Sequence, residues 1–229
     1  MKKTKKLLSY GILLVLAPGL VWIGLTVFRD RSYAYISLLV ALAACVPFFL
    51  RYEKKSTGRE LVLIAVMVAL SSLGRIVFVF VPFFKPVTAV VIITALYLGG
   101  EAGFLTGALS AIVSNLFYGQ GPWTPFQMFT WGMIGLLAGL FARWLLKNRI
   151  LLCVYGAMSG VIFSAIMDTW TTMMRDGAFS WSFYLAALTT ALPVTLVYLV
   201  SNVIFLLLLT RPMGEKLERV KVKYGLMQE

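Results

Sequence analysis

The sequence consists mainly of apolar runs, each long enough to cross a lipid bilayer as a helix, that alternate with short polar connections. A spanning helix needs about 20 mostly apolar residues, because the hydrocarbon core of a bilayer is about 30 Å thick. Apolar residues occupy 60% of the 229 positions and charged residues only 13%, whereas about 25% of a soluble domain is charged. The pattern predicts an all-α, polytopic membrane helix bundle without a large domain outside the membrane.

Eight spans are predicted from the apolar runs. They cover residues 7–28, 33–50, 60–81, 86–99, 102–118, 127–146, 150–174 and 183–210. The first run follows the basic segment MKKTKK, as a signal peptide would. However, it exceeds the usual length of a signal-peptide core and ends without an A-x-A cleavage site, so we interpret it as a retained span.

The distribution of Lys and Arg predicts the orientation of these spans. With eight spans, both termini lie on one side together with the loops at 51–60, 99–101 and 143–149. That side carries 16 of the 21 basic residues. Because basic loops stay in the cytoplasm, both termini are predicted to be cytoplasmic, in a multi-pass protein of the cell membrane. The net charge of +12 is then explained by contact with anionic lipid, and no nucleic-acid partner is expected.

Several kinds of chemistry are excluded by residues that the chain lacks. It contains no histidine, so catalysis by histidine and the usual zinc hydrolase sites are ruled out. It has no G-x-x-x-x-G-K-[ST] motif either, so ATP hydrolysis through a P-loop is not expected of this chain. Cys45 and Cys153 lie within separate apolar runs and are interpreted as small buried hydrophobes rather than as a disulfide or metal site. No metal and no permanently bound cofactor are predicted.

Small residues recur four positions apart in several runs. The pairs and triplets are Ala65 and Ala69; Gly99, Gly103 and Gly107; Gly135 and Gly139; and Gly156 and Gly160. Membrane helices associate by close backbone approach, which small residues permit. The simplest interpretation of each stripe is packing between helices of this chain.

Two ionisable residues are predicted at membrane depth, Asp168 in the seventh run and Arg75 near the outer end of the third. Such residues are costly in a bilayer and usually mark a functional site. They either form a structural ion pair, or Arg75 extends to the interface while Asp168 accepts hydroxyl hydrogen bonds, or one or both face a ligand cavity. Glu101 is expected at a solvated turn.

Polar and aromatic residues gather where the fifth and sixth runs meet on the outer side. The polar ones are Asn115, Tyr118, Gln120, Thr124 and Gln127, and the aromatic ones are Trp123, Phe126 and Trp131. Ligand pockets combine aromatic walls with a few placed polar groups. An interfacial aromatic belt would also collect Trp and Tyr, but it needs no inward-facing Asn or Gln. A pocket for an external solute is therefore favoured, with the loops at 82–86 and 177–181 available to cover it.

Three motifs in spans three to eight resemble a known family. They are AVMVA (65–69) on the first core helix, the turn LGGEAG (98–103), and GPWTPFQM (121–128) leading to Trp131, Gly132 and Gly135. Together they resemble the six-helix substrate-binding S component of energy-coupling factor (ECF) vitamin transporters. The resemblance divides the chain into two extra spans and a linker at 1–56, a six-helix binding core at 57–211 and a basic cytoplasmic tail at 212–229.

The resemblance implies a transporter of several subunits with different roles. The S component binds a vitamin from outside and delivers it inward through a transmembrane coupling subunit that two cytoplasmic ATPases drive. By this resemblance, Ala65 and Ala69 form the face that docks on the coupling subunit. The expected substrate-binding residues are Arg75, Asn115, Tyr118, Gln120, Trp123, Thr124, Gln127, Trp131, Asp168 and Thr172.

The resemblance points to cobalamin as the ligand, because the GPWTPFQM segment is similar to that of cobalamin-assigned members. Many amides and rings with few charges also suit a bulky, nearly neutral ligand. Pantothenate, riboflavin and a queuosine precursor stay open. A stand-alone secondary transporter is the main rival, although coupling to ions usually needs carboxylates at the bilayer midplane, and only Asp168 is near. A membrane enzyme is disfavoured, since no carboxylate pair is evident.

Overall fold

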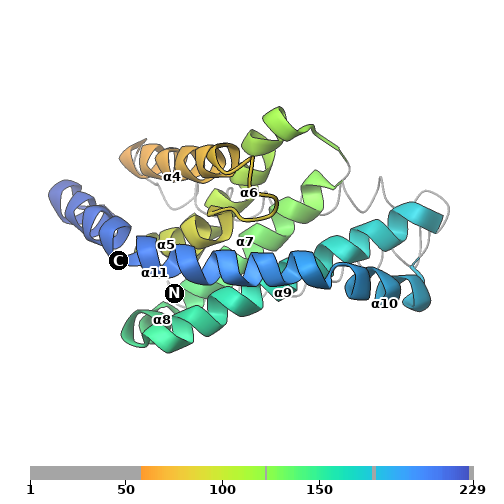
Figure 1. The fold of residues 1–229 in the computed structure, drawn as a ribbon. Helices are drawn as coiled ribbons and strands as arrows, with labels where there is room; N and C mark the ends of the chain where they lie inside the picture. The colour runs from red at the N-terminus through yellow and green to blue at the C-terminus, as the bar shows by residue number, and fades with distance from the viewer. Residues whose placement is uncertain (1–57, 122, 177–178, 227–229) are drawn as a thin grey trace, which may run out of the picture.

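The computed structural model describes residues 58–121, 123–176 and 179–226, and these residues are helical wherever they have regular structure (Figure 1). The helices are α4 (Gly58–Val77), α5 (Val87–Leu98), α6 (Gly100–Tyr118), α7 (Thr124–Leu140), α8 (Ala142–Lys147), α9 (Arg149–Asp176), α10 (Trp181–Thr190) and α11 (Leu192–Tyr224). Among them, α4, α9 and α11 are long and apolar enough to cross a membrane. The predicted spans 7–28 and 33–50, together with Cys45, lie outside the described residues.

Helix α5 is the centre of the bundle. Every residue from Val87 to Leu96 is buried, and the helix contacts α4, α6, α7, α9 and α11. A helix that is apolar on all sides must be enclosed by others, and the sequence of α5 (VTAVVIITALYL) has that character. The other helices are therefore arranged around a short, fully buried element.

Helices α6 and α7 pack through the predicted glycine stripes. A Cβ atom at Gly135 would lie 2.5 Å from the carbonyl group of Gly103, and one at Gly107 would lie 2.5 Å from the backbone of Trp131. Side chains cannot occupy such short gaps, so glycine allows the two backbones to touch. The prediction that these stripes serve internal packing is confirmed.

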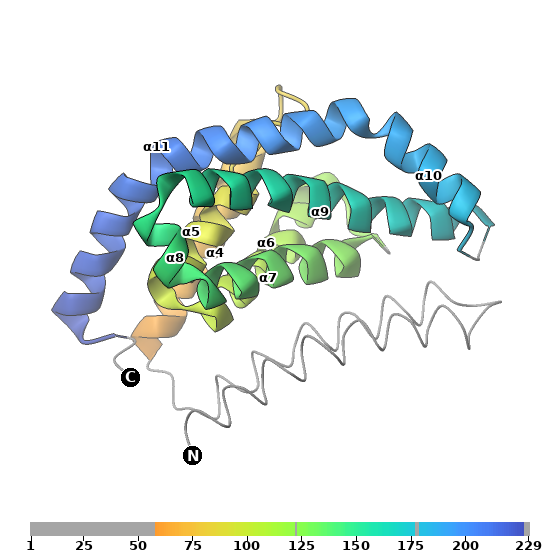
Figure 2. The same cartoon turned by 90° about the horizontal axis from the view of Figure 1, so that it is seen from below.

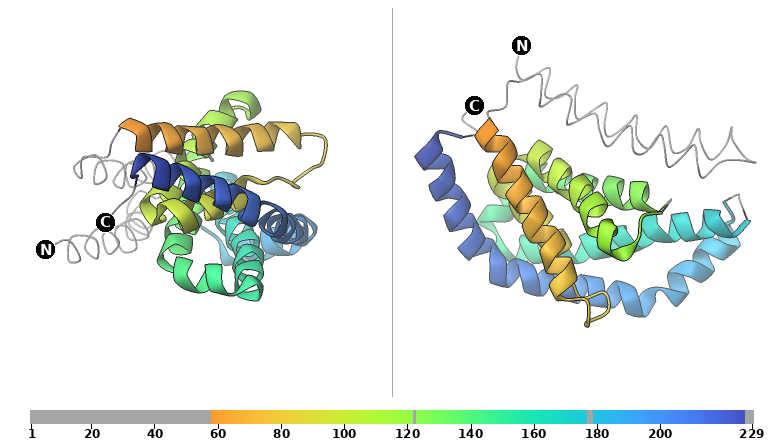
Figure 3. Two further views of the ribbon diagram at one scale, coloured as in Figure 1. Left: turned by 90° about the vertical axis from the view of Figure 1, so that its left-hand side faces the viewer. Right: turned by 90° about the horizontal axis from the view of Figure 1, so that it is seen from above.

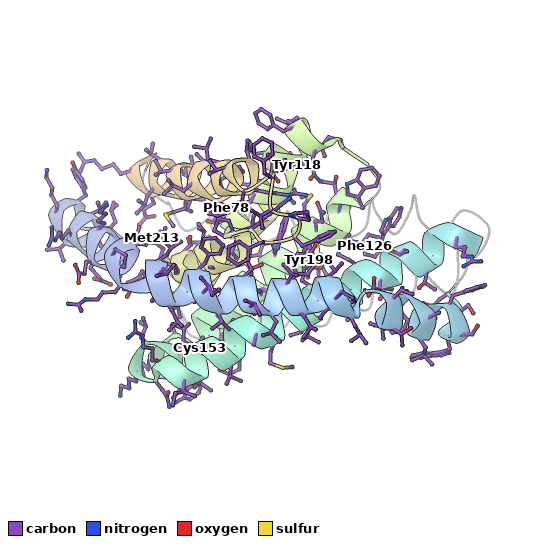
Figure 4. The ribbon with its side chains drawn as sticks, viewed as in Figure 1. Phe78, Tyr118, Phe126, Cys153, Tyr198 and Met213 are labelled. Atoms are coloured by element: carbon purple, nitrogen blue, oxygen red, sulfur yellow. The ribbon has the colours of Figure 1, made fainter. Side chains whose placement is uncertain are left out.

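Helices α9 and α11 lie side by side along most of their length (Figures 1 and 2). A Cβ atom at Gly160 would come within 2.9 Å of the Leu199 backbone nitrogen, so this stripe also brings two helices together. Asn202 on α11 donates a hydrogen bond of 3.1 Å to the Gly156 carbonyl oxygen on α9. Cys153, also on α9, is a free, half-buried cysteine (Figure 4).

Helix α4 lies obliquely across the bundle on the side of α5 and α6 (Figure 3). Ile64, Met67 and Ser71 face inward and are buried. Ala65 and Ala69 are exposed on the opposite side, where their exposed apolar neighbours are Val62, Val66, Leu70 and Leu73. Unlike the glycine stripes, this pair does not pack against another described helix of the chain.

Two predicted spans are each divided into two helices, and the tail is helical. The span at 127–146 breaks at Phe141 into α7 and α8, and the span at 183–210 breaks at Ala191 into α10 and α11. Pro193 stands in the first turn of α11, a position that proline favours because it lacks a backbone N–H. Beyond residue 211, where a basic tail was expected, α11 continues to Tyr224. Its last part turns away after Pro212 (Figure 2), as expected for a proline inside a helix.

Candidate binding site

A cavity of about 220 Å³ lies between the helices at the end of α4. It is lined by Arg75, Phe83, Lys85, Val87, Thr88, Gln127, Trp131, Gly160, Phe163, Tyr198 and Asn202. These residues come from α4, α5, α7, α9, α11 and the connection between α4 and α5. The site is thus assembled from segments that are distant in the sequence.

The connection at 78–86 supplies two of the lining residues, Phe83 and Lys85. Phe83 has a φ of 62°, a left-handed conformation that is costly for a residue with a side chain and is often found at functional sites. Its ring meets that of Tyr198 edge-on, with 5.8 Å between centroids. The backbone N–H of Lys85 donates to the Ser201 hydroxyl at 2.9 Å, and this hydroxyl donates back to the Lys85 carbonyl at 3.0 Å. The connection is thereby fastened to α11.

Arg75 is fixed by neutral groups on α6. Its Nη1 atom donates to the Ser114 hydroxyl at 2.6 Å and to the side-chain Oδ1 of Asn115 at 2.7 Å. The guanidinium carbon lies 4.5 Å from the centre of the Tyr118 ring and 5.4 Å from that of Trp131, distances typical of cation–π contacts. Of the alternatives considered from the sequence, the ion pair with Asp168 is not formed by these two described residues.

Asn115 is the centre of a polar network behind the cavity wall. It is fully buried, and its Nδ2 atom donates to Thr124 Oγ1 at 2.9 Å and to Gln127 Oε1 at 2.8 Å. Thr124 in turn donates to Gln120 Oε1 at 3.0 Å. This chain of bonds connects Arg75 to the start of α7, so it orients both Arg75 and Gln127 toward the cavity.

Aromatic rings form another part of the cavity wall. The Trp131 and Phe163 rings are stacked, with 5.0 Å between centroids and an angle of 16°. Tyr198 contacts Phe163 edge-on at 5.2 Å. Trp131 is only 5% exposed, so a belt at the lipid interface does not account for it. Flat apolar walls of this kind suit a planar ligand group.

Lys85 adds a second positive charge to the cavity. Its Nζ atom lies 4.6 Å from the centre of the Tyr118 ring, the same ring that Arg75 contacts. Burial and, to a smaller extent, the charge of Arg75 lower the pKa of Lys85 from its ordinary value. The empty cavity is therefore an unfavourable place for this charge.

The structure separates the ten residues predicted for the site into three groups. Arg75, Gln127 and Trp131 line the cavity, whereas Asn115, Tyr118, Thr124 and Gln120 form or support the network behind it. Tyr118 does so through its ring and by donating to the Arg75 carbonyl oxygen at 2.7 Å. The third group, Trp123, Asp168 and Thr172, does not line it.

This third group lies at the α9 side of the bundle. Trp123 packs against a separate cluster around Phe126 (Figure 4) and Trp170. The Asp168 carboxylate lies beside the Ser164 hydroxyl and interacts with Tyr198, while Thr172 donates to the Asp168 backbone carbonyl at 2.8 Å. Of this group, only Asp168 interacts with a described residue of the cavity wall, Tyr198.

Several lining residues were not predicted. Lys85 and Phe83 appeared in the sequence only as part of a loop that could cover the site. Tyr198 and Asn202 are four positions apart in an otherwise apolar run, so they share one helix face. This spacing of two polar side chains in a predicted span could have indicated that α11 contributes to the site. Figure 4 shows the position of Tyr198 on α11.

The fold and cavity agree with the match to a known family. The family model described as "ECF-type riboflavin transporter, S component" matches residues 55–215, which is well over half of the chain. The chain belongs to this family. Its membership confirms the resemblance seen in the sequence motifs. It also makes the protein a membrane transport subunit rather than an enzyme, and it implies association with an ECF module.

The chain is also similar to curated proteins named UPF0397. One from Aliivibrio fischeri (strain MJ11) is 30% identical over 132 residues, covering 49% of this chain and 71% of the relative. One from Vibrio atlanticus (strain LGP32) matches with the same identity and coverage. No solved structure matches the chain.

Proposed function

We propose that this protein captures a small vitamin or vitamin precursor in the cavity between α4, α7, α9 and α11 and delivers it to an ECF module. The observation that supports the proposal most directly is the cavity itself, which combines stacked aromatic rings with polar groups from four helices and one connection. Pockets for small molecules have this composition. The cavity lies within the part of the chain that the family model covers.

The module that completes the transporter consists, in this proposal, of a transmembrane coupling subunit and two cytoplasmic ATPases. The exposed α4 face around Ala65 and Ala69 is the proposed docking surface, because small residues there leave a flat strip among exposed apolar side chains. The proposed orientation follows the positive-inside rule, with both termini in the cytoplasm and the cavity open to the outside.

Riboflavin is the first ligand to test, because the family description names it and its planar ring suits the Trp131–Phe163 wall. Riboflavin exceeds the cavity volume of about 220 Å³ moderately, and cobalamin, the ligand suggested by the sequence resemblance, exceeds it by far. Cobalamin would fit only if the surrounding segments moved far apart. Pantothenate and a queuosine precursor are smaller and belong in the same panel.

The binding proposal is tested by equilibrium dialysis of the purified full chain in detergent against riboflavin, pantothenate, cobalamin and a queuosine precursor. We expect saturable binding of one of them, weakened about tenfold by Trp131→Leu, since an aromatic contact contributes about 0.5–1.5 kcal/mol beyond the area that it buries and about 1.4 kcal/mol corresponds to a factor of ten. Trp181→Leu is the matched control, because Trp181 is 70% exposed and lies outside the cavity. Equal effects of the two variants would place the ligand elsewhere.

The transport proposal is distinguished from a secondary transporter in proteoliposomes. We expect uptake only when the coupling subunit, the ATPases and ATP are present. Accumulation by the isolated chain under a proton or sodium gradient would establish the secondary transporter instead.

A further inference from the structure

The positive charges of the cavity have no acidic partner in its wall. Arg75 and Lys85 both line the cavity, and the remaining described lining residues are neutral. Both cations contact the same Tyr118 ring, at 4.5 Å and 4.6 Å. Asp168 interacts with Tyr198 but does not line the cavity.

The hydrogen bonds of Arg75 leave part of its guanidinium available. Both of its hydrogen bonds to described residues are donated by Nη1, to Ser114 and Asn115. The donors on Nε and Nη2 have no hydrogen-bond partner among the described residues. A guanidinium has five N–H donors in a fixed planar arrangement that matches a carboxylate or phosphate. Arg75 is therefore held through Nη1, and its Nε and Nη2 donors are available to a ligand.

Lys85 shares the cavity and the Tyr118 ring with Arg75, and its backbone rather than its side chain is hydrogen-bonded. The two hydrogen bonds between Lys85 and Ser201 fix the connection, and the ammonium group is thereby kept near a second cation. Partly buried like charges repel and are poorly solvated. An anionic ligand would supply the charge that this part of the cavity lacks.

We propose that the transported ligand carries an anionic group, a carboxylate or a phosphate, that binds to Arg75 and Lys85 while its apolar part contacts the aromatic side chains that line the cavity, Trp131 and Phe163 among them. The inference rests on the proposed function, because it assigns the chemistry of the ligand in the same cavity. It replaces the nearly neutral ligand that the sequence suggested, since the sequence did not reveal that Lys85 enters the site.

The test compares anionic and neutral members of matched pairs by equilibrium dialysis of the full chain. The pairs are flavin mononucleotide with riboflavin and pantothenate with its alcohol, pantothenol. We expect the anionic member of the bound pair to bind about tenfold tighter or more. Lys85→Gln should abolish most of that preference and Lys85→Arg should retain it. Arg175→Gln is the control, because Arg175 contacts the Phe183 ring and does not line the cavity.

Lys85 is the preferred site for substitution because its side chain makes no hydrogen bond to a described residue, so Lys85→Gln is expected to fold, and circular dichroism checks this. If a pair binds without preference for the anion, or with preference for the neutral member, the anionic ligand is refuted and the proposed function stands. A preference that survives Lys85→Gln also refutes the assignment. If no member of either pair binds and the vitamin panel above is negative, the proposed function fails, and this inference fails with it.

Discussion

Replacing Asn115 by leucine removes the centre of the network behind the cavity while keeping the number and branching of the side-chain heavy atoms. Three hydrogen bonds are lost: those donated to Thr124 and Gln127, and the one accepted from Arg75. Because Asn115 is fully buried, water does not replace them. The variant therefore tests whether this network stabilises the bundle and orients the binding residues.

The expected loss in the free energy of unfolding follows from the number and type of these hydrogen bonds. Between membrane helices a neutral hydrogen bond contributes about 0.6 kcal/mol and the strongest about 1.7 kcal/mol. Two neutral bonds and one charge-assisted bond together give a loss of about 3 kcal/mol in the free energy of unfolding. The control Thr171→Val should cost less than about 0.5 kcal/mol, since Thr171 is exposed and bonds only within its own helix.

The assay is reversible unfolding of the full chain in mixed micelles with increasing SDS, followed by circular dichroism. Gln127→Leu and the double variant that combines it with Asn115→Leu complete a double-mutant cycle. Because Asn115 and Gln127 share one bond, the double variant should cost less than the two single variants together, by about 0.6–1.7 kcal/mol. The network would not act as the structure indicates if Asn115→Leu lowered the free energy of unfolding by less than about 1 kcal/mol, or if the effects of the two single variants were strictly additive.

Three further predictions address packing, docking and charge. Gly135→Ala should destabilise the fold by about 1–3 kcal/mol, as its Cβ would meet the facing backbone. Gly58→Ala, with nothing within 4 Å, should be tolerated in the same unfolding assay. Ala65→Leu or Ala69→Leu should abolish ATP-dependent uptake and leave ligand binding unchanged, and loss of binding as well would contradict the docking role. Affinity for the anionic probes should fall as pH rises through the lowered pKa of Lys85, below 10.5, because only the charged ammonium attracts an anion. The fall should be absent in Lys85→Gln.

The sequence was informative wherever a property is local to one helix. Apolar length predicted membrane helices, and four-residue glycine spacing predicted that Gly103, Gly135 and Gly160 lie in close contacts between helices, as they do. Arg75, Gln127 and Trp131 were predicted as site residues from their polar or aromatic character, and they line one cavity. Each of these inferences depends on the chemistry of neighbouring residues and on helix periodicity.

Tertiary structure decided which of those residues share a cavity. Lys85 and Tyr198 are 113 positions apart and meet only because α11 packs against the centre of the bundle and fastens the 78–86 connection through Ser201. The same packing leaves Trp123 and Thr172 outside the cavity wall. Helix periodicity determines which face of a helix is buried, but the pairing of faces depends on contacts between distant segments, and these contacts set the charge of the cavity.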